Sequence, residues 1–157
     1  MRTFGLALSP LLLCLGLAGC LNNMSSTRKI GDTVHDMNDQ ARWGRLGDAA
    51  QYVEPTYRGQ YLANHKLWGS TVQLADAEVV HVQIAQGAEH ATAFVTYSWY
   101  ATDTMTLHQS VVRQRWQSLG SNYALISEVV VQGDPQLLGA KGESTSTEAA
   151  PISLLNQ

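Results

Sequence analysis

The chain has few cysteines, few charges and no long hydrophobic run. Of its 157 residues, two are cysteine and 15% are charged, and the formal net charge is −3 at pH 7. Two cysteines are too few for a disulfide scaffold or a cysteine-rich metal site. The slightly acidic balance excludes binding of nucleic acid or of an anionic bilayer by charge. The most apolar stretch, within residues 1–20, is shorter than the roughly 20 apolar residues that a membrane-spanning helix needs.

Motifs that mark catalysis are also missing. The five histidines form no His-x-His or His-x-x-x-His pair that would suit a metal ion, and the sequence has neither a Gly-x-Ser-x-Gly elbow nor a glycine-rich phosphate loop. The sequence therefore predicts no catalytic residue, no metal site and no cofactor. With 45% apolar residues, four tryptophans and six tyrosines, it does predict a folded core.

The N-terminal segment has the pattern of a secretory signal, with one cation at Arg2, no acidic residue and a short leucine-rich middle. The segment ends in Leu17-Ala18-Gly19-Cys20. These residues closely resemble the lipobox of bacterial lipoproteins, which is a leucine, two small residues and an obligatory cysteine. The resemblance implies that residues 1–19 are removed as a signal peptide and that Cys20 is acylated on its sulfur and on its new amino group. The membrane is then a partner through this lipid.

Lipidation at Cys20 accounts for both cysteines. Cys14 leaves with the signal peptide and Cys20 carries the lipid, so the mature chain has no thiol for a disulfide or a nucleophile. Because two acyl chains anchor a protein stably, the protein is expected in the cell envelope. An aspartate directly after the lipidated cysteine would mark retention in the inner membrane. Leu21 stands at this position, which favours the outer membrane, facing the periplasm. The alternatives are an ordinary secretory signal or a cytosolic protein with an apolar N-terminus.

The mature chain divides by composition into three parts. Residues 20–33 are polar and predict a tether, residues 34–132 hold every tryptophan and tyrosine and predict one domain, and residues 133–157 predict a disordered tail. A domain of about a hundred residues can bury a core without disulfides.

The domain is expected to open with two helices. Asp32 or Thr33 can cap the first, whose apolar residues recur at near-helical spacing to Val53. The second is expected to start at Pro55, because proline is tolerated in a first helical turn, and to end before Gly69.

Everything after Gly69 favours a sheet. Four strands are predicted at about 71–84, 91–100, 107–117 and 123–131, from alternating apolar residues and dense β-branched and aromatic residues. Their short connections require antiparallel neighbours. The predicted fold class is therefore α+β, with N-terminal helices packed on one face of a curved four-stranded antiparallel meander.

This order of elements, with its aromatic residues, resembles the nuclear-transport-factor-2-like superfamily of cone-shaped domains. The resemblance implies a cone that either holds a pocket or docks a partner. It rests on residues of both helices and of the sheet: Trp43, Tyr52, Pro55, Tyr61, Trp99, Gln114, Arg115, Trp116, Tyr123 and Leu125. Enzymes of the superfamily use an Asp, His or Tyr in the cone, and no such residue can be matched here.

Large aromatic side chains are the candidates for lining a pocket, since they can stack on a ligand. Core packing is the alternative explanation. The candidates are Trp43, Trp68, Tyr97, Trp99 and Trp116.

Two pairs of polar residues are weaker candidates for chemistry. His81 and His108 lie on predicted strands and could meet across the sheet, either as a ligand pair or as an acid/base pair near pH 7. The alternative is two solvated histidines on an outer face of the sheet. Asp76 and Glu78 share one strand face and could act as paired carboxylates, although a charged strand edge that prevents association is the more common role.

Three functions remain open from the sequence. The first is a lipid-anchored envelope protein that binds a small apolar ligand or another envelope protein. The second is a small pocket enzyme of the isomerase, dehydratase or cyclase type with a His or Asp proton shuttle. The third is a structural subunit of an envelope or secretion assembly.

Overall fold

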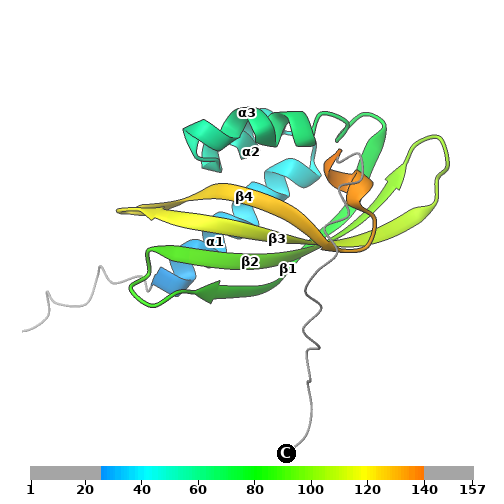
Figure 1. The fold of residues 1–157 in the computed structure, drawn as a ribbon. Helices are drawn as coiled ribbons and strands as arrows, with labels where there is room; N and C mark the ends of the chain where they lie inside the picture. The colour runs from blue at the N-terminus through cyan, green and yellow to red at the C-terminus, as the bar shows by residue number, and fades with distance from the viewer. Residues whose placement is uncertain (1–25, 140–157) are drawn as a thin grey trace, which may run out of the picture.

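A computed structural model describes residues 26–139 of the chain. The expected signal peptide, Cys20 and residues 140–157 lie outside the described residues. Helices come first and strands follow (Figure 1). The elements are α1 (Ser26–Arg42), α2 (Leu46–Ala49), the short 3-10 helix η1 (Ala50–Tyr52), α3 (Pro55–Asn64), β1 (Val72–Ile84), β2 (His90–Ala101), β3 (Leu107–Leu119), β4 (Asn122–Gln132) and a second 3-10 helix, η2 (Pro135–Leu138).

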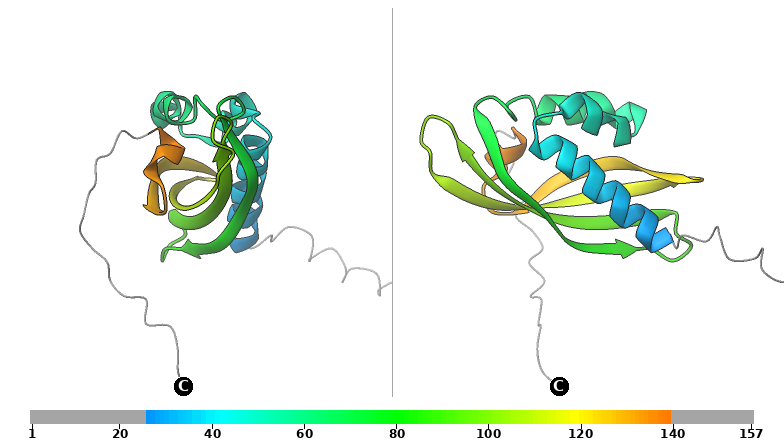
Figure 2. Two further views of the ribbon diagram at one scale, coloured as in Figure 1. Left: turned by 90° about the vertical axis from the view of Figure 1, so that its right-hand side faces the viewer. Right: turned by 180° about the vertical axis from the view of Figure 1, so that it is seen from behind.

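The four strands form one antiparallel meander in the order β1-β2-β3-β4. Register shifts interrupt both outer pairings, at Leu74/Asp76 and Val79/His81 between β1 and β2 and at two places between β3 and β4. Such bulges increase local twist and bend a sheet. Figure 2 shows the result, a strongly curved sheet with the helices on its concave side and η2 across one end. The predicted fold class is therefore confirmed.

Strand β2 supplies the centre of the core. Its side chains alternate, so that every second residue from Ala91 to Trp99 is buried on the concave face. Helix α1 lies against this face and buries one stripe of residues at helical spacing. The buried apolar residues of the stripe are Ile30, Val34, Met37 and Ala41.

Helix α1 begins earlier than predicted, and this corrects the extent of the tether. The sequence placed residues 20–33 outside the domain, with the helix capped at Asp32 or Thr33. The structure starts the helix at Ser26, and Ile30 is fully buried. Ile30 lies one helical turn before Val34 and on the same face of α1. The otherwise polar residues 26–33 therefore belong to the helix that packs on the core.

The single first helix predicted to reach Val53 is instead broken at Gly44. Gly44 has a positive φ of 70°, and a Cβ there would lie 3.4 Å from the Cα of Gly69. Glycine suits this left-handed position, where α1 ends beside the backbone of the loop before β1. Helix α3 does begin at Pro55, as predicted, with the Glu54 carboxylate capping it.

The domain also ends later than predicted. The tail was expected from residue 133, but η2 follows β4 and packs back onto the sheet. The Asp134 side chain caps η2, and Leu137 and Leu138 are both buried. The indole of Trp68 donates a hydrogen bond to the Leu137 carbonyl (2.8 Å). These contacts place residues 133–139 within the fold.

Candidate functional site

Two features of the concave side are candidates for function: a network of buried polar side chains in the core, and a pocket at the end of the sheet beside η2. The network joins α1, α3 and the strands. Its polar side chains are all almost completely buried: Asn38, His65, Tyr97, Gln114 and Glu128.

Asn38 and Gln114 form the centre of the network as a reciprocal amide pair. Asn38 Nδ2 donates to Gln114 Oε1 (3.2 Å), and Gln114 Nε2 donates to Asn38 Oδ1 (3.0 Å). The Tyr97 hydroxyl donates to the same Asn38 oxygen. Gln114 Nε2 also reaches Glu128 Oε1 (3.0 Å), which connects the amide pair to the one carboxyl group of the network. A buried polar group without a hydrogen-bond partner destabilises the fold. These mutual hydrogen bonds therefore favour a single arrangement of α1 on the sheet.

Glu128 and His65 face each other with 3.3 Å between Oε2 and Nε2. His65 Nδ1 lies 2.7 Å from the Tyr61 carbonyl oxygen. A carbonyl only accepts hydrogen bonds, so Nδ1 carries a proton and Nε2 of the neutral ring is an acceptor. Glu128 Oε2 has no hydrogen-bond partner, so the 3.3 Å approach to Nε2 is a contact between two buried polar atoms rather than a hydrogen bond.

Burial sets the protonation of both residues. Burial raises the pKa of Glu128 to about 8, and the hydrogen bond from Gln114 only partly offsets this rise. Burial also lowers the pKa of His65 to about 4, and the contact with the Tyr61 carbonyl only partly offsets this fall. Both shifts disfavour the charged form, as desolvation does. At neutral pH Glu128 is therefore a protonated, uncharged carboxyl group, and it lies beside an uncharged imidazole.

Aromatic rings separate this pair from η2. His65 packs against Tyr61 and, edge-on, against Trp68, with both pairs of ring centroids 4.2 Å apart. Trp68 in turn contacts Tyr97 edge-on, at 5.2 Å. Burial raises the pKa of Tyr61 and of Tyr97 far above the usual tyrosine value, with Glu128 adding to both shifts. These tyrosines stay neutral, and the network is a packed part of the core.

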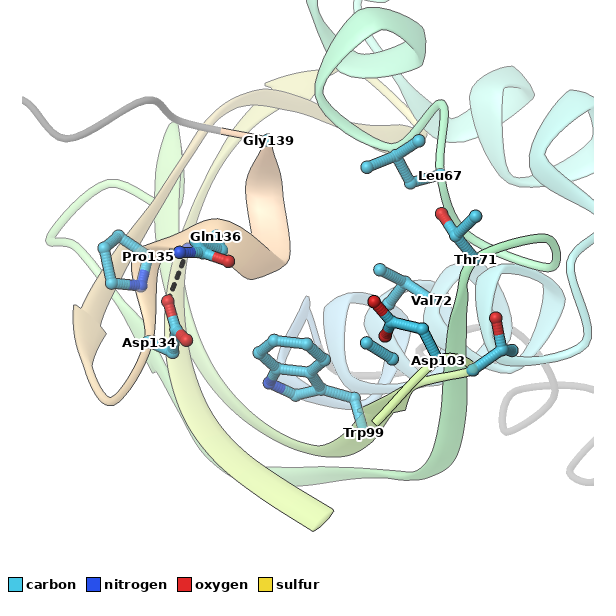
Figure 3. A pocket seen from close by; sticks show the side chains of 11 residues that line it. Leu67, Thr71, Val72, Trp99, Asp103, Asp134, Pro135, Gln136 and Gly139 are labelled. Atoms are coloured by element: carbon cyan, nitrogen blue, oxygen red, sulfur yellow. Dashed lines mark hydrogen bonds between the residues drawn. The ribbon is translucent and has the colours of Figure 1, made fainter. Parts of the chain in front are cut away.

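The pocket lies at the end of the sheet, between η2 on one side and the start of β1 on the other (Figure 3). Its volume is about 750 Å³, within the range of small-molecule sites. Trp99 of β2 lies between the two walls, with Pro135 and Gln136 of η2 opposite Leu67 and Val72. Neither His65 nor Glu128 lines it.

Trp99 is held rigidly. Its Nε1 donates to Ser110 Oγ (3.1 Å), and its ring stacks on that of His108 with the centroids 4.7 Å apart. Ser110 also accepts from the backbone N–H of Asp134 (3.1 Å), which joins the indole to the start of η2. Trp99 is only 3% exposed, so it forms a fixed part of the pocket wall and not an open face on which a ligand could stack.

A glycine allows η2 to close this side of the pocket. Gly133 has a positive φ of 87°, and a Cβ there would lie 2.2 Å from the backbone oxygen of Gln109 and 2.8 Å from the Cα of Ser110. The chain therefore passes directly over β3 before turning into η2, and no larger residue fits without moving the backbone.

The structure separates the five aromatic candidates. Trp99 lines the end pocket, whereas Trp43 and Trp68 line a smaller recess of about 400 Å³ near the end of α1. Trp43 is 64% exposed, while Tyr97 and Trp116 are buried in the core. Only one of the five thus belongs to the larger pocket.

The two weaker polar pairs do not form sites. His81 and His108 lie on β1 and β3 with β2 between them, opposite Phe94 and Trp99 respectively, so the prediction that they could meet is wrong. Asp76 forms an ion pair with Arg42 (3.1 Å) rather than acting together with Glu78.

Sequence reasoning missed His65, Glu128 and Asn38. Glu128 carried a usable signal, because it is the only charged residue in the apolar run of β4. His65 follows Tyr61 by one helical turn, a spacing that places both on one face. Their pairing depends on how α3 packs on β4, which no local pattern specifies.

Comparisons of the chain with protein-family models, with curated proteins and with solved structures find no match. Within residues 26–139, no group of three or more His, Cys, Asp or Glu side chains is placed to hold a metal ion. None of the helices in that same range is both long enough and apolar enough to cross a membrane. The site is therefore interpreted from its own geometry.

Proposed function

We propose that this chain is a lipid-anchored protein of the bacterial cell envelope, whose nuclear-transport-factor-2-like domain binds a small ligand in the end pocket. The pocket is the observation that carries the binding role: a space of about 750 Å³ with a fixed indole in its wall. Helices on the concave face of a curved four-stranded meander support the superfamily.

The lipid anchor is supported by Leu17-Ala18-Gly19-Cys20. Only residues 21–25 separate Cys20 from the start of α1, and five residues span at most roughly 18 Å. The domain would then stand close to the membrane at the Ser26 end of α1. Figures 1 and 2 place η2, and with it the pocket, towards the other end of the domain. A ligand in the periplasm would reach the pocket from the side away from the membrane.

A variant that fills the pocket tests the binding role. Thr71 is an exposed residue of the pocket wall, so Thr71→Trp places an indole in the space at little cost to the core. Compounds that raise the unfolding temperature of the wild-type chain should fail to do so in this variant. The control is Gln86→Trp, in the exposed turn between β1 and β2. Compounds that stabilise Thr71→Trp as well as wild type would place their site elsewhere.

A pocket enzyme is the second candidate, because Glu128 is a protonated carboxyl group 3.3 Å from the imidazole of His65, and both residue types can transfer protons. Such an enzyme needs its substrate to contact the acid. The end pocket is not lined by either residue, and the ring of Trp68 covers His65. If Glu128→Gln abolishes a turnover that the wild-type chain shows, the enzyme replaces the binding protein.

A further inference from the structure

The convex face of the sheet carries exposed apolar residues. The helices lie on the concave side, and in Figure 1 α1 lies behind the strands. Successive side chains of a strand point to opposite faces. Val79 and Val130 pack on the core, so the next residues, Val80 and Val131, point to the convex face. Val80 is 60% exposed there, and Val131 is 46% exposed.

These valines belong to a group that crosses all four strands. In the register of the sheet Phe94 lies opposite Arg113, and the next row holds Glu78, Thr96 and Val111. We call the apolar members of this group the outer patch: Val80, Phe94, Val111, Val129 and Val131. Single exposed valines are common on protein surfaces, but a contiguous apolar patch marks an interaction surface.

Charges on the same face are separated by sign. Glu78 lies on β1, whereas Arg113 and Arg115 lie on β3. All three are exposed, and none of them forms an ion pair with another residue of 26–139. Asp76, on the same side as Glu78, is already paired with Arg42. Strand β2 runs between the two signs and holds them roughly 10 Å apart at the backbone, which is two strand spacings.

We propose that the outer patch is a homodimer interface, in which two copies of this chain pack convex face to convex face about a two-fold axis along β2. An axis in this direction places β1 of each copy over β3 of the other. Glu78 of one copy then meets Arg113 and Arg115 of the other, and the symmetry makes this contact twice. A two-fold axis across the strands would instead place like charges over one another, which is unfavourable.

The apolar residues fit the same arrangement. Phe94 lies on β2, so the two copies of its ring meet near the axis, and Val80 of each copy lies over Val111 of the other. The strands have 11–13 residues. With about 3.3 Å per residue and about 4.8 Å between strands, they form a face of roughly 700–800 Å². A standard stable interface takes about 800 Å² from each copy. Curvature of the sheet reduces the contact, so we expect association at micromolar concentration.

Cysteine crosslinking of the full-length chain in cells tests the contact. Thr96→Cys places a thiol on the convex face near the expected axis, and Gln60→Cys, on the exposed side of α3, is the matched control. A short bis-maleimide should link Thr96→Cys into dimers about fivefold or more efficiently than Gln60→Cys. The chain without an added cysteine measures the background from Cys14 and Cys20. Equal yields for the two variants would overturn the inference.

Exchange of the charges identifies the pairing. In the Thr96→Cys chain, Glu78→Arg and Arg113→Glu should each lower the yield of linked dimer about fivefold or more, because each places like charges together. When these two variants are expressed together with different tags, crosslinking between them should recover, since opposite charges then meet in both contacts. A variant that had only failed to fold would not recover. Unchanged yields in the single variants, or no recovery in the mixture, would show the inference to be wrong.

The outer patch could instead bind the chain's own C-terminal segment, in which Ile152, Leu154 and Leu155 are the large apolar residues. Deletion of residues 150–157 separates the two occupants. If a second copy covers the face, the deletion leaves the crosslinking yield of Thr96→Cys unchanged. A yield that rises from background only after the deletion would assign the face to this segment. Crosslinking of Thr96→Cys to a different protein in place of the dimer would equally overturn the inference.

Discussion

Glu128 Oε2 lies 3.3 Å from His65 Nε2 in the core. The Tyr61 carbonyl requires the other ring nitrogen of His65 to be a donor. Burial keeps the carboxyl group protonated and the imidazole neutral at pH 7, so the pair carries no buried charge. The pair connects α3 to β4 and, through Gln114, to α1.

Stability should fall as the pH rises above the ordinary histidine pKa. Wherever the proton sits, the folded pair holds one proton between pH values of about 4 and about 8. The unfolded chain, with ordinary pKa values of 4.5 and 6.5, holds one proton between these values and none above 6.5. Between pH 6.5 and about 8 the folded chain therefore binds the extra proton, and the free energy of unfolding falls by about 1.4 kcal/mol per pH unit.

Below the ordinary carboxyl value of 4.5 the sign reverses, because the unfolded chain then binds the extra proton and stability falls as the pH falls. Urea unfolding across this pH range should show a plateau between 4.5 and 6.5 with a decline on each side. A stability that rises steadily from pH 6.5 to 8 would contradict a Glu128 that stays protonated in the folded chain.

Glu128→Gln tests the charge of the pair. The glutamine side chain is uncharged, as the protonated acid is, and its oxygen can still accept from Gln114 Nε2. Stability near pH 6 should therefore change little, and the alkaline decline should disappear. If wild-type His65 were an imidazolium, the variant would leave a buried cation without its counter-charge and lose about 3–5 kcal/mol.

Asn38→Leu should destabilise the domain by about 2–4 kcal/mol, because it removes the acceptor of Tyr97 and one partner of Gln114 while both stay buried. Asn122→Leu, at an exposed position on β4, is the control and should change stability by less than about 1 kcal/mol. Chemical unfolding of both variants measures the difference. Equal losses would show that the amide pair contributes nothing specific.

Gly133→Ala should disturb η2 and the pocket. The added Cβ would meet the backbone of Gln109 and Ser110, so the turn must move, at an expected cost of more than about 2 kcal/mol. Gly120→Ala is a matched control, with a similar positive φ of 78° and open space around the added Cβ. It should cost only about 1–2 kcal/mol, for the left-handed backbone alone. Thermal unfolding of both variants would reveal whether the close approach matters.

Cys20→Ala should abolish labelling of the protein by a radioactive fatty acid and release it from membranes, since the anchor is expected on this sulfur. Cys14→Ala provides the comparison, because Cys14 lies within the expected signal peptide and should leave labelling intact. Cell fractionation and labelling measure both effects. Full labelling of Cys20→Ala would refute the lipoprotein assignment.

The sheet could be predicted from the sequence because its pattern is local and repeated. In β2 the dense β-branched and aromatic residues predict the strand, and the observed bounds differ from the prediction by one residue at each end. Pro55 likewise located the start of α3 through its own geometry.

The polar network and the edges of the domain could not be predicted in the same way. His65 and Glu128 are distant in the sequence, and their pairing exists only because α3 packs on β4. Ile30 is a single apolar residue in a polar segment, and Leu137 and Leu138 are a short apolar pair in another, so neither segment has a pattern that marks it as part of the core. The end pocket also combines turns that follow two different strands, which places Asp103 and Asp134 together only in three dimensions.

The indole N–H signals in the NMR spectrum of the isotopically labelled chain test the end pocket most directly. Each tryptophan gives one such signal, and single Trp→Phe variants assign them. A set of small aromatic compounds of positive, neutral and negative charge should include binders that shift the Trp99 signal and leave the buried Trp116 signal in place. Binders that shift the Trp43 or Trp116 signal and leave Trp99 unchanged would contradict the end pocket as the ligand site.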